Sequence, residues 1–348
     1  MVEQPRDKAA RAKRRRRYML IALLAIIVGS AGLPFTGALM TDVSYAQEAS
    51  QQANPRAETW REARQGLEGT TTVRGQETDV LIQSGGQVWR EVREGPVSTY
   101  AGWILAGVIL AIVLFQVVFG TVKLEKRSGV TITRWSLFER VMHWYTAILF
   151  IILAITGLSL LLGRALVIPL IGKEAFAAWA NIAKPVHDYL ALPFVVGLAL
   201  MILPWIGENI PRKHDLTWLK MGGGYLGGKG HPPAGFVNAG EKIWYWLLFI
   251  GSVVLIWSGF YLLFPNMGWE RSTMQLANVA HGISGTLLVA FSFGHIYLGT
   301  LGNQGSLEGM VSGEVDEEWA KMHHNLWYDE VKAKGQQPSG AGSRAAHA

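Results

Sequence analysis

The sequence predicts an all-α integral membrane protein: a four-helix transmembrane core, preceded by an additional transmembrane helix and a signal-like N-terminus. Three observations support this fold class. Half of the 348 residues are hydrophobic, they gather in five segments, and the basic residues between those segments alternate in number. Such bunching is typical of a chain whose apolar helices are solvated by lipid.

Residues 1–46 have the pattern of a secretory signal peptide. Eight Lys or Arg occupy the first seventeen positions, an apolar stretch follows, and Ser44 and Ala46 stand at the −3 and −1 positions of a cleavage point. The alternative is an uncleaved anchor helix. Either way, the polar segment 47–99 is expected in the periplasm, loosely structured apart from a short helix around "AETWREARQGLE".

Five apolar segments follow, each long enough or nearly so to cross a hydrocarbon core of ~30 Å at ~1.5 Å per residue. They cover residues 100–120, 138–162, 187–206, 241–264 and 279–301. The first is the additional helix. The other four belong to a core region, 121–301, and the tail comprises 302–348.

The links between these segments predict how the helices are oriented. Links 121–140 and 207–242 carry five Lys or Arg each, whereas 163–186 carries three and 265–280 carries one. Basic links stay in the cytoplasm, so the order is cytoplasmic, periplasmic, cytoplasmic, periplasmic. The tail is therefore expected in the cytoplasm of a multi-pass protein of the bacterial inner membrane.

Several classes of function are excluded by composition. The chain has no cysteine, which removes disulfides, iron–sulfur clusters and covalently attached haem from it. The net charge of +6 is explained by membrane topology, so no nucleic-acid partner is expected. The stretch "MGGGYLGGKGHPPAGF" lacks the spacing of a phosphate-binding loop, and no internal repeat is apparent.

The nine histidines divide into two groups. Five are expected in water: His214, His231, His323, His324 and His347. The other four lie at or within the last four apolar segments: His143, His187, His281 and His295. Ionisable residues inside a membrane are costly, so these four are functional candidates that should face the bundle interior. A hydrogen-bonded interface role is the alternative for any one of them alone.

The predicted orientation sorts the four histidines by depth. His187, at the start of its helix, and His281 lie near the periplasm; we call them the first pair. His143 and His295 lie toward the cytoplasm; we call them the second pair. Two imidazoles at one depth on different helices are what a six-coordinate haem needs. The sequence thus predicts a four-helix di-haem cytochrome b bundle.

The last helix can serve both haems. Fourteen residues separate His281 from His295, a rise of ~21 Å with only ~40° between the side chains. Gly157, fourteen residues after His143, gives a macrocycle room, as do Gly282, Gly285 and Gly294 on the last helix. Arg140, one turn before His143, is a candidate partner for a haem propionate.

Five stretches of the chain resemble a known family. They are "RWSLFERVMHWYTAILFIILAITGLSLL", "KPVHDYLALPF", "FVNAGEKIWYW", "ANVAHGISGTLLVAFSFGHIYLGT" and "GEVDEEWAKMHHNLWY". In order and spacing they are similar to the gamma subunit, a di-haem cytochrome b, of membrane-bound respiratory formate dehydrogenase, over about residues 120 to 330. The signal-like start, the exported segment and the 100–120 helix depart from the compact four-helix form of that family.

The resemblance implies the same histidine pairing, with two haem b, and a quinone site beside the second haem. Asn238 and Gly240, in the N-A-G motif near His295, would contact menaquinone or another quinone such as ubiquinone. From the residues alone, Asn238 is equally well explained as a helix N-cap, and both roles can coexist.

The resemblance also implies partners: an iron–sulfur beta subunit and a molybdenum- or tungsten-dependent catalytic alpha subunit that oxidises formate. No catalytic residue for formate oxidation is expected on this chain. The nearest alternative is the cytochrome b subunit of a nickel–iron hydrogenase or a related quinone-linked oxidoreductase. An alternative from another class is a membrane transporter with histidine proton relays.

Overall fold

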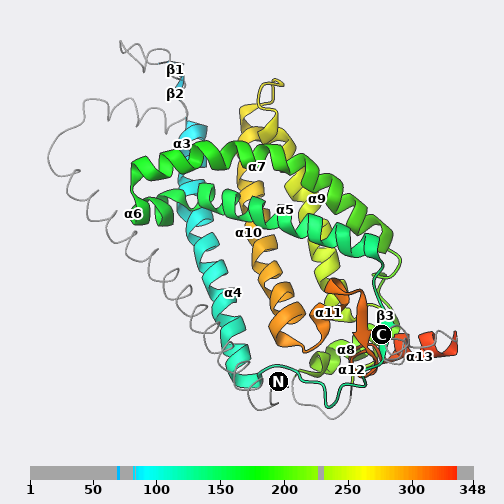
Figure 1. The fold of residues 1–348 in the computed structure, drawn as a ribbon. Helices are drawn as coiled ribbons and strands as arrows, with labels where there is room; N and C mark the ends of the chain where they lie inside the picture. The colour runs from blue at the N-terminus through cyan, green and yellow to red at the C-terminus, as the bar shows by residue number, and fades with distance from the viewer. Residues whose placement is uncertain (1–68, 71–80, 83, 226–230, 335–348) are drawn as a thin grey trace, which may run out of the picture. The chain divides into compact units, whose positions relative to one another are not determined.

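The computed structural model describes residues 69–70, 81–82, 84–225 and 231–334. Figure 1 draws these as ribbons and the remainder as a grey trace. The predicted signal peptide or anchor, 1–46, lies outside the described residues. So does the short helix expected around "AETWREARQGLE".

Within the described residues, five helices are long and apolar enough to cross a membrane, which confirms the predicted fold class. Together with the shorter helical stretches that adjoin some of them, they are Val88–Phe119, Leu137–Leu161, Lys173–Trp205, Ala239–Leu263 and Arg271–Gly302. Their regular α-helical parts are α4 (Ser98–Phe119), α5 (Leu137–Leu161), α7 (Lys173–Ile202), α9 (Ala239–Leu263) and α10 (Arg271–Tyr297). Much of their apolar surface is exposed, as expected of helices solvated by lipid.

Shorter elements connect and extend these helices. The α-helices are α3 (Ser84–Val92), α6 (Ile168–Ile171), α8 (Lys213–Lys220), α11 (Ser306–Val311), α12 (Glu317–His323) and α13 (Asn325–Ala333). The strands are β1 (Gly69–Thr70), β2 (Leu81–Ile82), β3 (Thr131–Thr133) and β4 (Glu314–Asp316). Single π-helical turns occupy Arg93–Val97, Gly163–Val167 and Leu298–Gly302. Single 3₁₀ turns occupy Leu203–Trp205 and Gly222–Gly224.

Helix α7 differs from its prediction. It begins at Lys173, well before the apolar segment expected at 187, because its first turns are amphipathic and escape an apolarity criterion. The prediction that His187 opens a helix is therefore wrong, since it lies in the middle of α7. Pro185 and Pro193 are inside the helix, and membrane helices tolerate proline because neighbouring groups satisfy the freed carbonyls.

The chain divides into two compact units, each built from three stretches. The first unit comprises Met1–Gly107, Leu158–Ala183 and Val254–Thr286, and the second comprises Val108–Gly157, Lys184–Val253 and Leu287–Ala348. The five long helices each contribute residues to both. His281 belongs to the first unit, and His143, His187 and His295 belong to the second.

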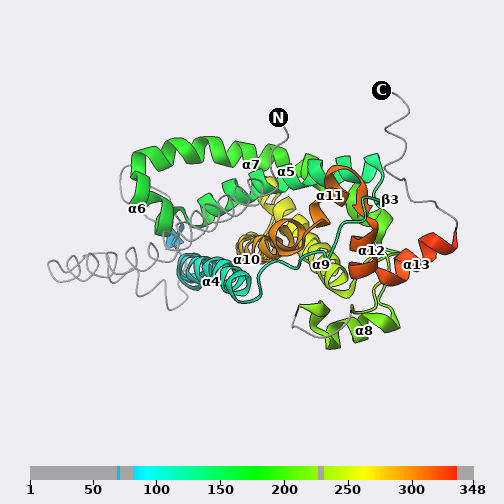
Figure 2. The same cartoon turned by 60° about the horizontal axis from the view of Figure 1, so that its bottom comes forward.

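Within each unit, α5 and α7 pack against each other, and the two helices run side by side in Figures 1 and 2. In the first unit, the Trp179 indole N–H donates to Ser159 Oγ at 2.8 Å. In the second unit, Gly197 faces Tyr145 so closely that a Cβ would lie 2.7 Å from the ring. A small residue at this position lets the two helices approach.

Helices α5 and α9 begin with the same device, a capping box. The backbone N–H of Glu139 donates to Ser136 Oγ at 3.3 Å, and that of Ser136 donates to Glu139 Oε2 at 2.8 Å. Asn238 and Glu241 repeat the pattern, with both bonds at 2.9 Å. Each box satisfies two backbone donors that a helix start leaves without partners.

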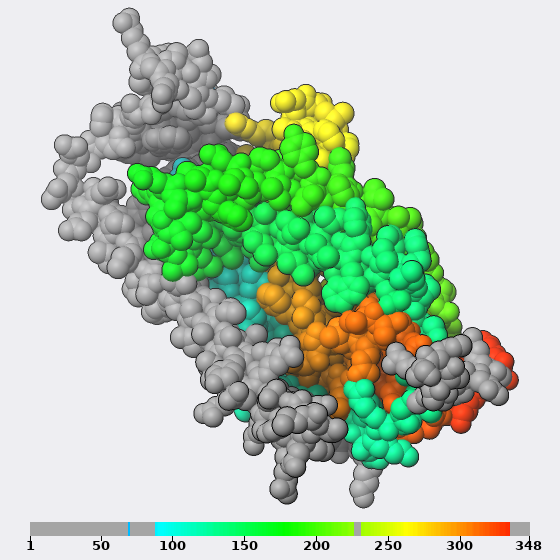
Figure 3. Space-filling view, in the orientation of Figure 1, coloured from blue at the N-terminus to red at the C-terminus, as the bar shows by residue number. Residues whose placement is uncertain are grey.

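The tail folds into the second unit through a small sheet and an aromatic core. Strand β4 pairs antiparallel with β3, Ile132 opposite Val315. A cluster of buried residues joins these strands to α12 and α13. In Figure 3 the orange part of the tail lies against the teal start of the core region. The cluster contains Ile132, Val315, Trp319, Ala320, Trp327, Tyr328 and Val331.

Candidate functional site

The second pair of histidines meets inside the second unit. His143 on α5 and His295 on α10 have ring centroids 6.2 Å apart, with their planes inclined by 57°. Two imidazoles that bind one iron through bonds of ~2 Å, each nitrogen about 1 Å from its ring centre, have centroids ~6 Å apart. The observed separation therefore fits a pair of histidines that would hold a single iron between them.

The surroundings of these two rings are aromatic. Trp244 on α9 stacks on His295, with centroids 5.2 Å apart and an angle of 16°. Trp144 meets His143 edge-on at 5.3 Å, and its indole N–H donates to the Met310 carbonyl of the tail. Among the described residues, the buried Nδ1 of His143 has no hydrogen-bond partner, so packing rather than hydrogen bonding orients this ring.

His187 has a different environment, which is also inside the second unit. Its Nδ1 lies 2.9 Å from the hydroxyl of Thr156 on α5. Its ring covers Gly157, where a Cβ would come within 2.9 Å of Cε1. The room predicted at Gly157 is thus filled by the imidazole of His187.

His281 has the same type of environment within the first unit. Its Nδ1 lies 3.2 Å from the hydroxyl of Ser258 on α9. A Cβ on Gly259 would come within 3.2 Å of the His281 Cε1. Thr156, Ser258 and Gly259 were not singled out from the sequence, because a hydroxyl or a glycine in an apolar helix carries no signal by itself.

The residues predicted for a quinone have other contacts in the structure. The side chain of Asn238 accepts the Glu241 backbone N–H and is the N-cap of α9, as its position before the helix suggested. A Cβ added to Gly240 would lie 2.9 Å from the ring of Trp218 on α8, so the backbone at Gly240 lies directly against that indole. A quinone role for Asn238 and Gly240 stays a prediction.

Arg140, predicted to meet a propionate, reaches the tail. Its guanidinium donates to the Val311 carbonyl at 2.6 Å, and its Nε is buried without a partner among the described residues. The contact fixes the side chain close to the start of α5. A propionate partner for Arg140 stays a prediction.

The expectation that His324 is solvated is wrong. The residue is 1 % exposed, and its Nδ1–H donates to the Gly235 carbonyl at 2.7 Å. Trp319 packs against its ring at 5.0 Å. The polarity of "KMHHN" concealed this burial, because the aromatic residues that cover His324 come from other turns of the tail. His323 is half-buried, and His231 is exposed as expected.

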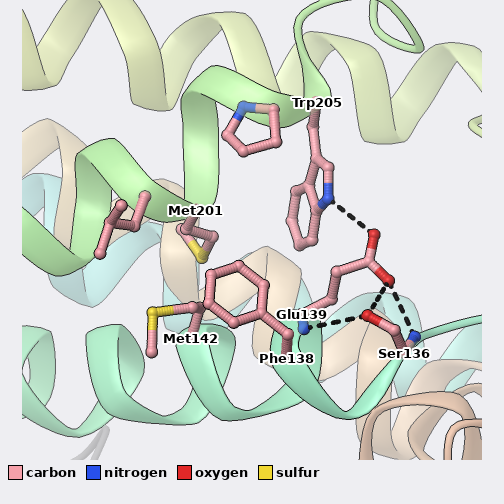
Figure 4. Close-up of a pocket in the computed structure, with 8 residues that line it drawn as sticks. Ser136, Phe138, Glu139, Met142, Met201 and Trp205 are labelled. Carbon is pink, nitrogen blue, oxygen red and sulfur yellow. Dashed lines mark hydrogen bonds between the residues drawn. The ribbon is translucent and has the colours of Figure 1, made fainter.

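A cavity of about 300 Å³ lies between the start of α5 and the end of α7 (Figure 4). Phe138, Met142 and Met201 supply apolar walls. At its polar end, the Glu139 carboxylate accepts the Ser136 hydroxyl and the Trp205 indole N–H. This carboxylate caps α5, so its role here is structural.

Comparison with known proteins identifies the class. Residues 134–313, more than half of the chain, match the prokaryotic cytochrome b561 family, and the chain belongs to that family. It is an integral membrane cytochrome b with an electron-transfer role, and the family implies haem b.

Individual relatives have the names that the sequence resemblance suggested. The chain is 27 % identical over 216 residues to the nitrate-inducible formate dehydrogenase cytochrome b556(Fdn) subunit of Escherichia coli K12, covering 61 % of this chain and 97 % of the relative. It is 27 % identical to the cytochrome b556(fdo) subunit of the same organism, covering 58 % and 94 %. It is 29 % identical to the formate dehydrogenase cytochrome b556 subunit of Haemophilus influenzae, covering 61 % and 89 %.

The residues present fit haem b. Imidazole is the usual protein ligand of haem iron, and the 6.2 Å between the His143 and His295 rings suits two such ligands. His295 is exposed and His143 only half-buried, although both lie in helices that can span a membrane. Imidazoles in that position need a polar partner or a ligand, and haem iron would supply one.

Proposed function

We propose that this chain is the di-haem cytochrome b subunit of a membrane-bound formate dehydrogenase. The observation that carries the proposal is the 6.2 Å separation of the His143 and His295 rings, taken with the names of the relatives. His143 and His295 would hold one haem b, and His187 and His281 a second. Haem b, when bound, supplies reversible one-electron transfer.

The chain's own residues would set the route of electrons. An iron–sulfur subunit, with a molybdenum- or tungsten-dependent catalytic subunit behind it, would dock near the first pair. Quinone would be reduced near the second pair, where Asn238 and Gly240 lie close to the start of α9. The Asn238 amide can hydrogen-bond a quinone carbonyl while its oxygen caps the helix.

The direction across the membrane rests on the charge of the links. The tail and the second pair would face the cytoplasm of the inner membrane, with the segment 47–99 in the periplasm, and residues 1–46 would export it as a signal peptide or anchor. Because the chain has no cysteine, single-cysteine variants at two exposed positions, Lys126→Cys and Glu270→Cys, report the sidedness of this chain. We expect an impermeant thiol reagent added outside to label the Glu270→Cys variant and to leave the Lys126→Cys variant unlabelled.

The central experiment is purification of the tagged full chain from its own membranes. We expect two haem b per chain, a b-type α band in the reduced-minus-oxidised spectrum, and formate dehydrogenase subunits in the complex. Formate should reduce the haems, and added quinone should reoxidise them. A hydrogenase large subunit in the complex would overturn the formate assignment in favour of the hydrogenase alternative. A preparation without haem would overturn the cytochrome proposal and favour a transporter.

A further inference from the structure

The end of the additional helix α4 is hydrogen-bonded to the end of α10. The Tyr297 hydroxyl donates to Gln116 Oε1 at 2.6 Å, and the nitrogen of the same amide donates to Thr121 Oγ1 at 3.3 Å. Phe115 meets the Tyr297 ring edge-on, with centroids 6.3 Å apart. All four residues belong to the second unit, and the two helix ends lie side by side in Figures 1 and 2. The Gln116 amide is held at both ends and gives Tyr297 a fixed partner.

The contact continues along the chain after α4. Val122 and Asn303 are partners in a parallel β-bridge. The Val122 N–H donates to the Gly302 carbonyl at 2.8 Å, and the Gln304 N–H donates to the Val122 carbonyl at 3.0 Å. Further contacts follow in the same order along both stretches: Leu124 with Gln304, Arg127 with Glu308, and Ser128 and Gly129 with Asp316. Residues 116–129, which we call the strap, thus run parallel to residues 297–316.

The strap precedes the part of the chain that matches the family. That match begins at residue 134, so it includes the four candidate histidines and leaves the strap outside. The contacts of Gln116 therefore do not follow from membership of the family. They show how the additional helix is attached to the core within the second unit.

The strap contacts α10 on the face opposite to His295. Tyr297 is two residues after His295, so their side chains are about 200° apart around the helix at ~100° per residue. On its own face, His295 approaches His143 on α5, with ring centroids 6.2 Å apart. Tyr297 is buried, at 7 % exposed, and an unpaired hydroxyl is costly at such a position. Its bond to Gln116 therefore restrains the distance of α10 from the strap, and with it the distance of His295 from His143.

We propose that the strap fixes the position of α10 at His295 and so sets the gap between the two histidines of the second pair. Gln116 and Tyr297 are positioning residues that act through His295. The additional helix is then part of the framework of the second pair, and its role is not limited to anchoring the chain in the membrane. The effect on haem rests on the proposed function, whereas the contacts between the strap and residues 297–316 do not.

The first test is a double-mutant cycle in the purified complex. Tyr297→Phe removes the donor, and Gln116→Met removes the acceptor at nearly constant volume. Each should speed the release of one haem to an acceptor protein by up to about tenfold, the factor that one buried hydrogen bond represents. Each should also shift the low-spin EPR signal of that haem, which should be the haem that His295→Ala lacks. The double variant should release haem no faster than the single variants, because all three lack the same bond.

Matched controls separate the strap from general effects on membrane helices. Tyr189 also follows a candidate ligand, His187, by two residues, but it is 80 % exposed. Tyr189→Phe should therefore leave both haems unchanged. Val118 lies two residues after Gln116, on the opposite face of α4, and is 70 % exposed, so Val118→Ala should also have no effect. In the test variants, the haem of the first pair reports that the protein is folded.

The second test does not depend on haem. Since the chain has no cysteine, Val122→Cys combined with Asn303→Cys introduces one possible disulfide. Partners on neighbouring strands are ~5 Å apart, a separation that a disulfide spans. An oxidant should therefore join the two positions in membranes that contain the full chain, as linked peptides in a digest would report. Val118→Cys combined with Asn303→Cys should stay reduced.

The outcomes are distinguishable. If Tyr297→Phe and Gln116→Met leave both haems unchanged, affect both equally, or have effects that add in the double variant, their bond does not position His295 and the inference is wrong. If cysteines at 122 and 303 do not join, the strap does not lie along the tail and the inference is again wrong. If the unmodified complex lacks two haems, the proposed function fails, while the disulfide still tests the strap.

Discussion

The two pairs of histidines are held by different forces. His187 and His281 are each hydrogen-bonded to a buried hydroxyl and seated on a glycine. His143 and His295 are instead set among indole rings, and the His143 Nδ1 has no partner within the described part of the chain. Hydrogen bonding makes a ligand more basic and aromatic packing does not. The comparison predicts a lower potential for the haem of the first pair, which suits electron flow from the first pair to the second.

The largest expected effect comes from removing a ligand. His281→Ala should reduce the haem content from the proposed two per chain to about one and abolish reduction of the remaining haem by formate, because in the proposed function electrons would enter at the first pair. His295→Ala should also leave about one haem, but formate should still reduce it. Haem is quantified as the pyridine complex, with His231→Ala, at an exposed position, as the control. A His281→Ala protein that retained both haems would rule out the pairing.

The next effect concerns a buried ion pair near the start of α9. Lys242 on α9 and Asp215 on α8 form an ion pair at 2.8 Å, with side chains 5 % and 11 % exposed. Asp215→Ala leaves the lysine charge buried and should lower the free energy of unfolding by about 3–5 kcal/mol, measured by thermal unfolding in detergent. We expect the haem of the second pair to be lost before that of the first.

The control for this variant is Glu208→Ala. Glu208 forms an exposed pair with Arg212 at 3.7 Å, which is expected to contribute about 0–1 kcal/mol. Burial raises the pKa of Asp215, but the bonds from Lys242 and from the Arg212 backbone hold that pKa below its usual value. The stabilisation by Asp215 should therefore persist above the pKa of ~3.9 in the unfolded chain and disappear as the pH falls through the lower folded value. If Asp215→Ala and Glu208→Ala lowered the free energy of unfolding equally, burial would not be what makes the Asp215 ion pair important.

A smaller effect is expected from the indole that stacks on His295. Trp244→Leu should weaken retention of the haem of the second pair by about tenfold and leave the first pair unchanged. Dissociation of haem to an acceptor protein measures this retention. Trp257→Leu is the matched control, since Trp257 is also on α9 but contacts Tyr261. If the Trp244→Leu variant lost haem only from the first pair, Trp244 would not support the second pair as proposed.

The smallest effect is a pH dependence carried by His324. Burial, and then the charge of Arg134, hold its pKa well below the usual value; Glu241 is 3.8 Å from its Nε2 and His323 is its neighbour. The unfolded chain binds this proton more readily, so stability is complete above pH ~6.5 and falls by up to about 1.4 kcal/mol per unit below it. His324→Gln should flatten the dependence of the melting temperature between about pH 7 and 5. An unchanged slope would show that other groups carry it.

Much of the fold could be read from the sequence. Five helices, and four histidines at or within the apolar segments, follow from apolar run length and from the cost of ionisable groups in lipid. Both are local properties of the chain. Helix limits were less accurate: α7 begins well before its apolar segment and encloses His187, because an amphipathic start resembles a loop in composition.

The sequence by itself determined the membrane class, the candidate ligands and the family resemblance, since each depends on residue types at fixed spacing. Only the tertiary structure decided which atoms meet those ligands. The contacts of Thr156 with His187 and of Ser258 with His281 join residues 31 and 23 positions apart, and Trp244 reaches His295 from another helix. His324 is buried by aromatic residues from other turns. A hydroxyl or an indole in an apolar helix becomes informative only when packing supplies its partner.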